Sequence, residues 1–490
     1  SEAVNTIDLV GTYNMKLSES FKSRTSIGGQ YLGVLFQGTS STGLLIVAGS
    51  SSIAGAAQTT SVESTTERRT VGVFIEEQIN FREKLFLTAA VRSDRGSAFG
   101  ASLESVFYPK VSASWLVSNE SFFNSEGLVS SLRLRGAWGD SGVQPGTNDA
   151  IRFFTPIAAT VDGGQSVTGV TFGGVGNADL KAERSREIEL GVDATMFSNR
   201  LGIELTYFNK NTQDALVFRQ LPLSLGVGAG RFENLGSVKN TGLEVGLNMR
   251  IVNSSKASFD LDFTGTFIDT ELTELGEGIE PVIFNQVQRH TEGFPLGGYW
   301  DKPFTFSDAN GDGLIAKDEV QVGDEAVYLG TPFAPTDLFF TGNLGLFGDK
   351  LVVRALLNYR GGQTLYNNTG AWRNGNSNTD ELNDPSTPLE DQARAIASKF
   401  FGTNAGYIED ASFWRLREIS LTYFFPEKML TSAGLSRLSL TLSGQNVAVF
   451  TSYTGLDPEI SSTGQSNFDA EEFLSQPPVR AWKARLNMSF

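Results

Sequence analysis

Residues 308 to 319 are the part of the sequence whose residue types and spacing match a specific chemistry, the binding of calcium. Calcium loops of twelve residues place oxygen donors at positions 1, 3, 5, 7 and 12 and a glycine at position 6. The spacing therefore predicts a calcium ion that stiffens a loop. A bare turn is the alternative, because no clear amphipathic helix precedes the segment. The residues at the diagnostic places are Asp308, Asn310, Asp312, Leu314 (through its carbonyl) and Glu319, with Gly313 at the turn.

Aromatic side chains in the expected loops are a second set of candidate ligands. Rings of this kind stack on sugars or grip a partner protein, and they also anchor chains at a membrane interface. Both interpretations stay open from the sequence. The candidates for substrate contact are Tyr299, Trp300, Tyr366 and Trp372.

The composition excludes several classes of function. The 490 residues include no cysteine and a single histidine, so thiolate metal sites and cysteine nucleophiles are excluded. That histidine, His290, has no nucleophile motif beside it, and we expect no catalytic residues and no enzyme activity. A net charge of -16 argues against a nucleic-acid partner, because phosphate binding needs clustered Lys and Arg.

Strict alternation of apolar and polar residues is the commonest pattern in the chain. Between positions 243 and 251, every odd residue is apolar and every even residue is polar or glycine. Segments of this kind form β-strands with one apolar and one polar face. We count about sixteen such segments along the chain. The longest apolar runs fall far short of the roughly 20 residues that a membrane helix needs.

Short turns alternate with long connections between these segments. Residues 198 to 200 and 348 to 350 form short turns, whereas the long connections are rich in Gly, Ser, Asn and Asp. This asymmetry is typical of transmembrane barrels, in which short turns face the periplasm and long loops face outside. The sequence therefore predicts an all-β, antiparallel transmembrane β-barrel, and the weaker alternative is a soluble sandwich or propeller. The long connections are expected at Gly38 to Thr66, Gly139 to Glu183, Thr270 to Gly293 and Gly361 to Glu409.

Several sequence blocks, in the same order along the chain, resemble the barrel of the SusC/RagA family of TonB-dependent outer-membrane transporters. No single block is decisive, whereas their order is hard to obtain by chance. The blocks are residues Tyr108 to Trp115, Leu132 to Gly139, Asn177 to Arg184, Tyr207 to Thr212, Asn234 to Glu244, Gly293 to Gly297, Trp414 to Arg417 and Ser443 to Asn446.

The resemblance implies that residues 1 to 490 are the C-terminal part of a barrel of about 22 strands in the outer membrane. The plug domain, the TonB box and the first strands of such a barrel are expected to lie outside this sequence. The resemblance also implies import of oligosaccharides or peptides, driven by the TonB complex through the plug, with a SusD-like lipoprotein over the extracellular mouth. The lipid of the outer membrane is the remaining partner.

Two other functions remain possible from the sequence. A barrel of about sixteen strands can close by itself and form a passive porin. A surface binding protein or adhesin, stiffened by calcium at residues 308 to 319, is the other alternative.

Overall fold

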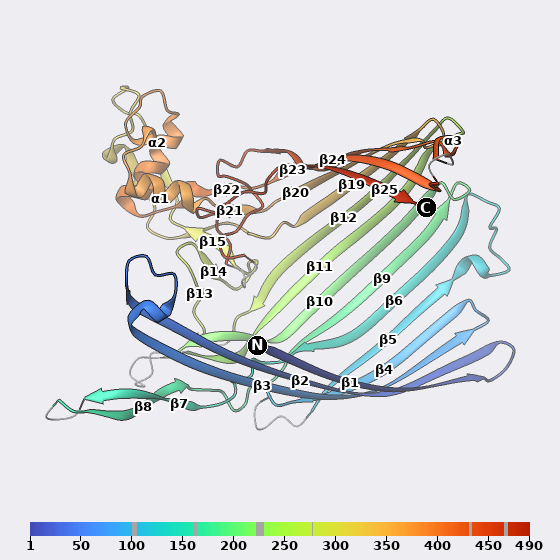
Figure 1. Ribbon diagram of the computed structural model, residues 1–490, viewed down its shortest axis with the longest axis horizontal. Coiled ribbons are helices and arrows are strands. Elements are labelled where there is room, and N and C mark those ends of the chain that lie inside the picture. The colour runs from blue at the N-terminus through green and yellow to red at the C-terminus, as the bar shows by residue number, and fades with distance from the viewer. Residues whose placement is uncertain (100–104, 161–163, 222–229, 277, 431–433, 465–468) are drawn as a thin grey trace. The chain divides into compact units, whose positions relative to one another are not determined.

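The computed structural model describes residues 1–99, 105–160, 164–221, 230–276, 278–430, 434–464 and 469–490 (Figure 1). The described chain divides into two compact units. Unit 1 comprises Ser1–Trp115, Arg135–Ile188 and Lys210–Ser237. Unit 2 comprises Leu116–Leu134, Glu189–Asn209 and Val238–Phe490.

Among the described residues, fifteen strands form one antiparallel sheet in which neighbours follow one another along the chain, apart from connections that carry small elements of their own. The sequence predicted about sixteen antiparallel strands, and the fifteen strands of this sheet agree with that prediction. The strands, in sheet order, are β1 (Glu2–Lys16), β2 (Phe21–Ile46), β3 (Ala56–Phe81), β4 (Leu85–Gly96), β5 (Val106–Leu116), β6 (Val129–Val143), β9 (Glu183–Met196), β10 (Leu201–Gln220), β11 (Gly230–Asn253), β12 (Ala257–Glu274), β19 (Thr336–Leu346), β20 (Leu351–Gly361), β23 (Phe413–Phe424), β24 (Arg437–Thr451) and β25 (Ala481–Ser489).

Smaller elements lie in the connections. A hairpin, β7 (Phe153–Thr160) and β8 (Ser166–Gly174), stands between β6 and β9. The short strands of unit 2 are β13 (Val282–Ile283), β14 (Gln288–His290), β15 (Gly298–Asp301), β16 (Phe304–Phe306), β17 (Val320–Val322), β18 (Val327–Gly330), β21 (Thr364–Tyr366) and β22 (Ile408–Asp410). The α-helices are α1 (Asn368–Asn376), α2 (Leu389–Ile396) and α3 (Glu427–Leu430). No helix in the described ranges is long and apolar enough to cross a membrane.

The cross-strand register explains the alternation seen in the sequence. Phe263 of β12 pairs with Phe340 of β19, and their ring centroids lie 5.0 Å apart on one face. The next pair, Asp262 and Thr341, lies on the other face. Side chains therefore sort by polarity because successive residues of a strand point to opposite faces.

A β-bulge in β23 shifts this alternation by one residue. The register with β20 slips between Leu356 and Leu357, which leaves Arg417 without an opposite residue. Exposed apolar residues accordingly fall at the even position Trp414 before the bulge and at the odd position Ile419 after it. A bulge inserts one residue and re-aims the side chains that follow.

The expected long loop from Gly38 to Thr66 was wrong. Strands β2 and β3 are each 26 residues long, and they remain paired as far as Ile46 opposite Ala56. Serine and threonine dominate this stretch, and they pair across the hairpin, as in the 2.8 Å hydrogen bond between the Ser41 and Ser61 hydroxyls. Threonine favours strands, so polar composition alone did not identify a loop.

Candidate functional site

Three long connections of unit 2 fold together into one body, which we call the loop body. It comprises residues 275–335, 362–412 and 452–480, within the described ranges, and it carries α1, α2 and the short strands β13 to β18, β21 and β22 (upper left in Figure 1). Every candidate site residue from the sequence lies in the first two of these connections.

A cluster of tyrosines forms the core of the loop body. Tyr299, Tyr366 and Tyr407 are each at most 1% exposed and pack against one another. The Tyr299 hydroxyl donates to the carbonyl of Ala470 at 2.7 Å, and the Asn374 amide donates to the Tyr407 hydroxyl at 2.6 Å. The core therefore joins all three connections. Burial raises the pKa of the Tyr299 and Tyr366 hydroxyls far above their usual value, which keeps both neutral.

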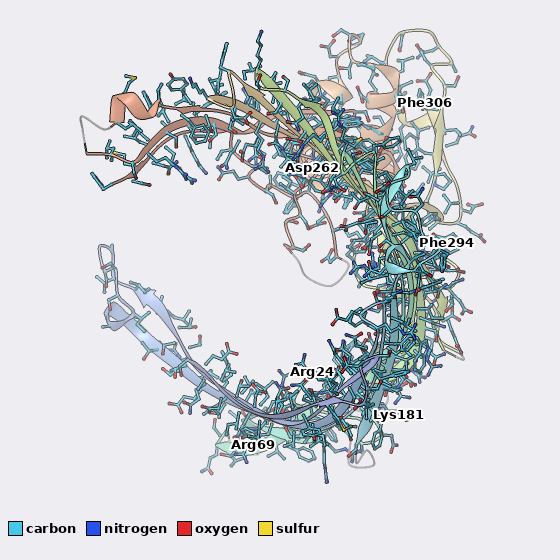
Figure 2. The ribbon with its side chains drawn as sticks, turned by 90° about the vertical axis from the view of Figure 1, so that its right-hand side faces the viewer. Arg24, Arg69, Lys181, Asp262, Phe294 and Phe306 are labelled. Atoms are coloured by element: carbon cyan, nitrogen blue, oxygen red, sulfur yellow. The ribbon has the colours of Figure 1, made fainter. Side chains whose placement is uncertain are left out.

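The four aromatic candidates occupy different environments. Tyr299 and Tyr366 offer no ring face to a ligand in this structure, because both are buried. Trp300 packs edge to face on Phe294, which Figure 2 labels, with the ring centroids 4.7 Å apart. Trp372, on α1, is 49% exposed and is the one of the four with an open face. Substrate contact by these residues stays a prediction.

His290 lies in the first connection and is largely buried. Its Nδ1 accepts a hydrogen bond from the amide of Gly297 at 3.1 Å, and its ring lies 4.8 Å from that of Phe284. Burial lowers the pKa of His290 from 6.5 to about 4. The imidazole is therefore neutral at physiological pH.

The lowered pKa of His290 predicts a pH dependence. The unfolded histidine binds a proton below about pH 6.5 and the folded one does not until about pH 4. Stability of the loop body is therefore complete above pH 6.5, falls as the pH drops, and has lost at most about 3 kcal/mol at pH 4. Hydrogen exchange of residues 284–298 against pH measures this. His290→Asn keeps a hydrogen-bond acceptor but does not titrate. If the stability of this variant depended on pH as that of the native protein does, the assignment to His290 would be wrong.

Residues 308–319 follow β16, whose last residue Phe306 is labelled in Figure 2, and end in the 3-10 helix η4 (Lys317–Glu319). Gly311 and Gly313 have φ angles of 71° and 81°, the left-handed region in which glycine avoids strain. The sharp turn predicted at Gly313 is therefore confirmed. The Gln392 side chain of α2 fixes this turn, because it accepts from the amide of Ile315 at 2.8 Å and donates to the carbonyl of Gly313 at 2.9 Å.

The carboxylates of this segment bind its own backbone in the structure. Asp308 accepts from the amide of Gly311 at 2.8 Å, and Glu319 accepts from the amides of Ala309 at 2.8 Å and Ala316 at 2.9 Å. Within the described ranges, no three Asp, Glu, His or Cys side chains are gathered as a metal site. The predicted donor atoms are all oxygen, as calcium prefers. In the structure, the carboxylate oxygens of Asp308 and Glu319 accept hydrogen bonds from backbone amides of the loop instead. The calcium site stays a prediction.

The third connection is held by a buried carboxylate. Glu472 is fully buried and accepts hydrogen bonds from the Thr369 hydroxyl at 2.5 Å, the Tyr453 hydroxyl at 3.3 Å and the Leu456 amide at 2.8 Å. These donors come from the second and third connections. The buried acid is tolerated because both of its carboxylate oxygens accept hydrogen bonds.

Two arginines of β23 fix the same connection to the sheet. Arg415 and Asp457, with side chains 3% and 5% exposed, form an ion pair of 2.6 Å. Arg417 binds Glu459 through two contacts of 2.9 and 2.5 Å. Burial raises the pKa of Glu459, but the hydrogen bond from Arg417 together with the charges of Arg417, Arg415 and Arg360 outweighs burial and holds that pKa below its usual value.

Sequence reasoning missed Gln392, Glu472 and Asp457. Each of them has a partner at least 42 residues away in the chain, and no local spacing marks such a contact. Arg415 and Arg417 stood in a block that resembles the SusC/RagA family, which was the one available signal for this anchor.

A polar recess of about 300 Å³ lies elsewhere in unit 2, on β6, β9, β10 and β11. Arg133 and Asp193 form an ion pair in it, 2.5 Å between Nη2 and Oδ2. The recess lies on the face opposite the exposed apolar residues Leu134 and Leu190. The polar face of the strands can therefore hold small polar groups.

Comparison with known proteins agrees with this architecture. The family described as TonB dependent receptor-like, beta-barrel matches residues 4–447. TonB-dependent receptor P3 of Formosa agariphila is 26% identical over 472 residues, which cover 86% of this chain and 46% of that protein. TonB-dependent receptor SusC of Bacteroides thetaiotaomicron is 24% identical over 439 residues, covering 82% of this chain and 42% of SusC.

A solved structure of the RagAB peptide transporter superposes with a TM-score of 0.83 at 19% identity, covering 100% of this chain and 56% of that chain. This chain spans slightly less than half the length of the curated relatives it matches. The resemblance to SusC/RagA transporters and the outer-membrane location are thus confirmed. The chain belongs to the family of TonB-dependent receptor-like β-barrels.

Proposed function

We propose that this chain is the barrel of an active outer-membrane importer. Its substrates are oligosaccharides or peptides, the TonB complex supplies the energy through a plug domain, and a SusD-like lipoprotein covers the extracellular mouth. The family assignment supports this function over a passive porin or an adhesin. The RagAB peptide transporter has a similar fold, which supports peptides as a substrate class in addition to oligosaccharides.

The observation that carries the proposal is the division of the strands into two faces with a folded loop body at one end. In β12 and β19, Phe263 and Phe340 lie on one face, and Asp262 and Thr341 lie on the other. An apolar outer face and a polar inner face are what a transmembrane barrel with a water-filled path requires. Trp372 is the exposed aromatic candidate for substrate contact on the loop body.

Uptake of fluorescent oligosaccharide and peptide libraries by the native host tests the proposal. The host carries the full-length protein as its sole copy, and uptake is compared with strains that lack TonB or the partner lipoprotein. We expect uptake of one substrate class that is lost without TonB and reduced without the lipoprotein. Uptake that is unchanged without TonB would identify a passive porin, and absence of uptake for both classes would overturn the importer.

We also propose that residues 308–319 bind calcium and that the ion stiffens the loop body. In the purified full-length protein, Glu319→Gln is expected to weaken calcium binding about tenfold or more, because it removes the charged, bidentate donor. Isothermal titration with calcium measures this. Asp318→Asn, at the exposed neighbouring residue, is the matched control and should bind as the native protein does. If the native protein does not bind calcium, the proposal is wrong and residues 308–319 form a turn without an ion.

A further inference from the structure

Four arginines lie in a row on one face of unit 1: Arg69 in β3, Arg95 in β4, and Arg184 and Arg186 in β9. Arg95, Arg184 and Arg186 stand at the strand ends that carry long connections, which we assign to the outer side of the membrane. Register with β4 places Arg69 at the same level within the longer strand β3. The Arg184 guanidinium donates to the carbonyl of Phe107 in β5 at 3.4 Å. The row therefore crosses the sheet from β3 to β9.

Register places Arg95 beside both neighbours. Arg95 pairs with Val71, two residues from Arg69, so these two arginines are diagonal neighbours on one face. On the other side, Ser93 pairs with Phe107, which puts Phe107 one diagonal step from Arg95. Arg95 and Arg184 thus flank the same aromatic residue.

The row continues a face that is apolar and exposed. Residues at alternate positions along β3, beginning two residues from Arg69, are about half exposed, and Ile188 next to Arg186 on the same face of β9 is 46% exposed. Such a face lies against lipid, so the arginines lie where headgroups begin. Figure 2 shows Arg24 and Arg69 on opposite sides of these strands. The apolar residues in β3 are Val71 (50%), Val73 (56%) and Ile75 (46%).

Two of the four arginines are neutralised within the chain. Arg69 binds Glu67 at 2.5 Å, and Arg186 binds Asp140 at 2.9 Å. In the described ranges, no carboxylate lies within ion-pair distance of Arg95 or Arg184. Among the residues that the structure describes, these two guanidinium groups at headgroup level therefore have no carboxylate partner.

We propose that Arg95 and Arg184 bind a phosphate group of an outer-leaflet lipid headgroup. Guanidinium groups bind phosphate through paired, charge-assisted hydrogen bonds. The exposed edge of Phe107 between them packs against the acyl chain or the sugar of the same lipid, since its side chain is 57% exposed on this face. The site is independent of the transport activity proposed above.

Native mass spectrometry of the detergent-purified full-length protein tests this site. The probes are bisphosphorylated lipid A and the same lipid after removal of its phosphates. We expect the native protein to retain bisphosphorylated lipid A, and Arg95→Gln/Arg184→Gln to bind it about 30-fold more weakly, from the loss of two headgroup-level cations. Arg95→Lys/Arg184→Lys keeps the charge but loses the paired hydrogen bonds, so it should bind more weakly than the native protein and more tightly than the Gln variant, which also controls for misfolding.

The matched control is Arg24→Gln/Arg68→Gln. It removes two arginines from the opposite face of the same hairpin, and binding is expected to stay at the native level. Equal weakening in this control, or equal retention of the lipid without phosphates, would overturn the proposal. Displacement of bound lipid by millimolar inorganic phosphate alone would also overturn it, because it would assign the site to a free anion.

Discussion

Arg415→Ala is expected to detach the connection of residues 452–480 from the sheet while the sheet itself remains folded. The change leaves Asp457, whose side chain is 5% exposed, as a buried charge without its partner. Removing one member of a buried ion pair costs about 3 to 5 kcal/mol. Opening of this connection should therefore become at least about 100-fold more frequent. Hydrogen exchange of the amides in residues 453–464 measures the opening in the full-length protein.

The double variant Arg415→Leu/Asp457→Leu is the control for this prediction. It removes both charges and keeps apolar volume, so it should recover most of the lost stability. Lys84→Gln, in the short turn between β3 and β4 of unit 1, should have no effect. Slow exchange in Arg415→Ala, equal to that of the native protein, would show that the ion pair does not hold the connection.

Tyr299→Ala is expected to melt the loop body locally. The fully buried side chain packs against Tyr366 and Tyr407, and its hydroxyl binds the carbonyl of Ala470. Truncating a large buried aromatic costs about 3 to 5 kcal/mol, because a cavity remains. Limited proteolysis of the full-length protein should then cut within the loop body while the strands stay protected.

Two further variants serve as controls: one separates packing from hydrogen bonding at Tyr299, and the other truncates an aromatic ring outside the core. Tyr299→Phe retains the ring and loses one hydrogen bond, which costs about 1 kcal/mol. Trp372→Ala truncates a half-exposed ring and should leave proteolysis unchanged. Comparable cleavage in all three variants would show that the tyrosine core is not what holds the three connections together.

The strands were predictable because their signal is local. Alternation along β11 and β12 is visible in the sequence itself, and the register in the structure follows it. The prediction failed where the same local signal is ambiguous. The serine- and threonine-rich stretch of β2 and β3 shows no regular alternation of apolar and polar residues, and the bulge at Arg417 shifts the pattern by one residue.

The loop body was not predictable, because its contacts are long-range. Residue type and its place in an expected loop made Tyr299 a candidate for substrate contact, whereas its hydroxyl binds the carbonyl of Ala470, 171 residues away, in a closed core. Glu472 and Thr369 are separated by 103 residues. Residue type and spacing did identify the sharp turn at Gly313, since that geometry depends on neighbouring residues.

The most direct test of the membrane barrel uses the absence of cysteine from the chain. Single cysteines are placed at Leu243, Glu244, Leu247 and Asn248 of β11 in the full-length protein in outer membranes, and each is labelled with a water-soluble maleimide. Cysteines at 244 and 248 should react and those at 243 and 247 should not, because alternate residues face water and lipid. Uniform labelling of all four positions would contradict a strand that separates lipid from a water-filled path.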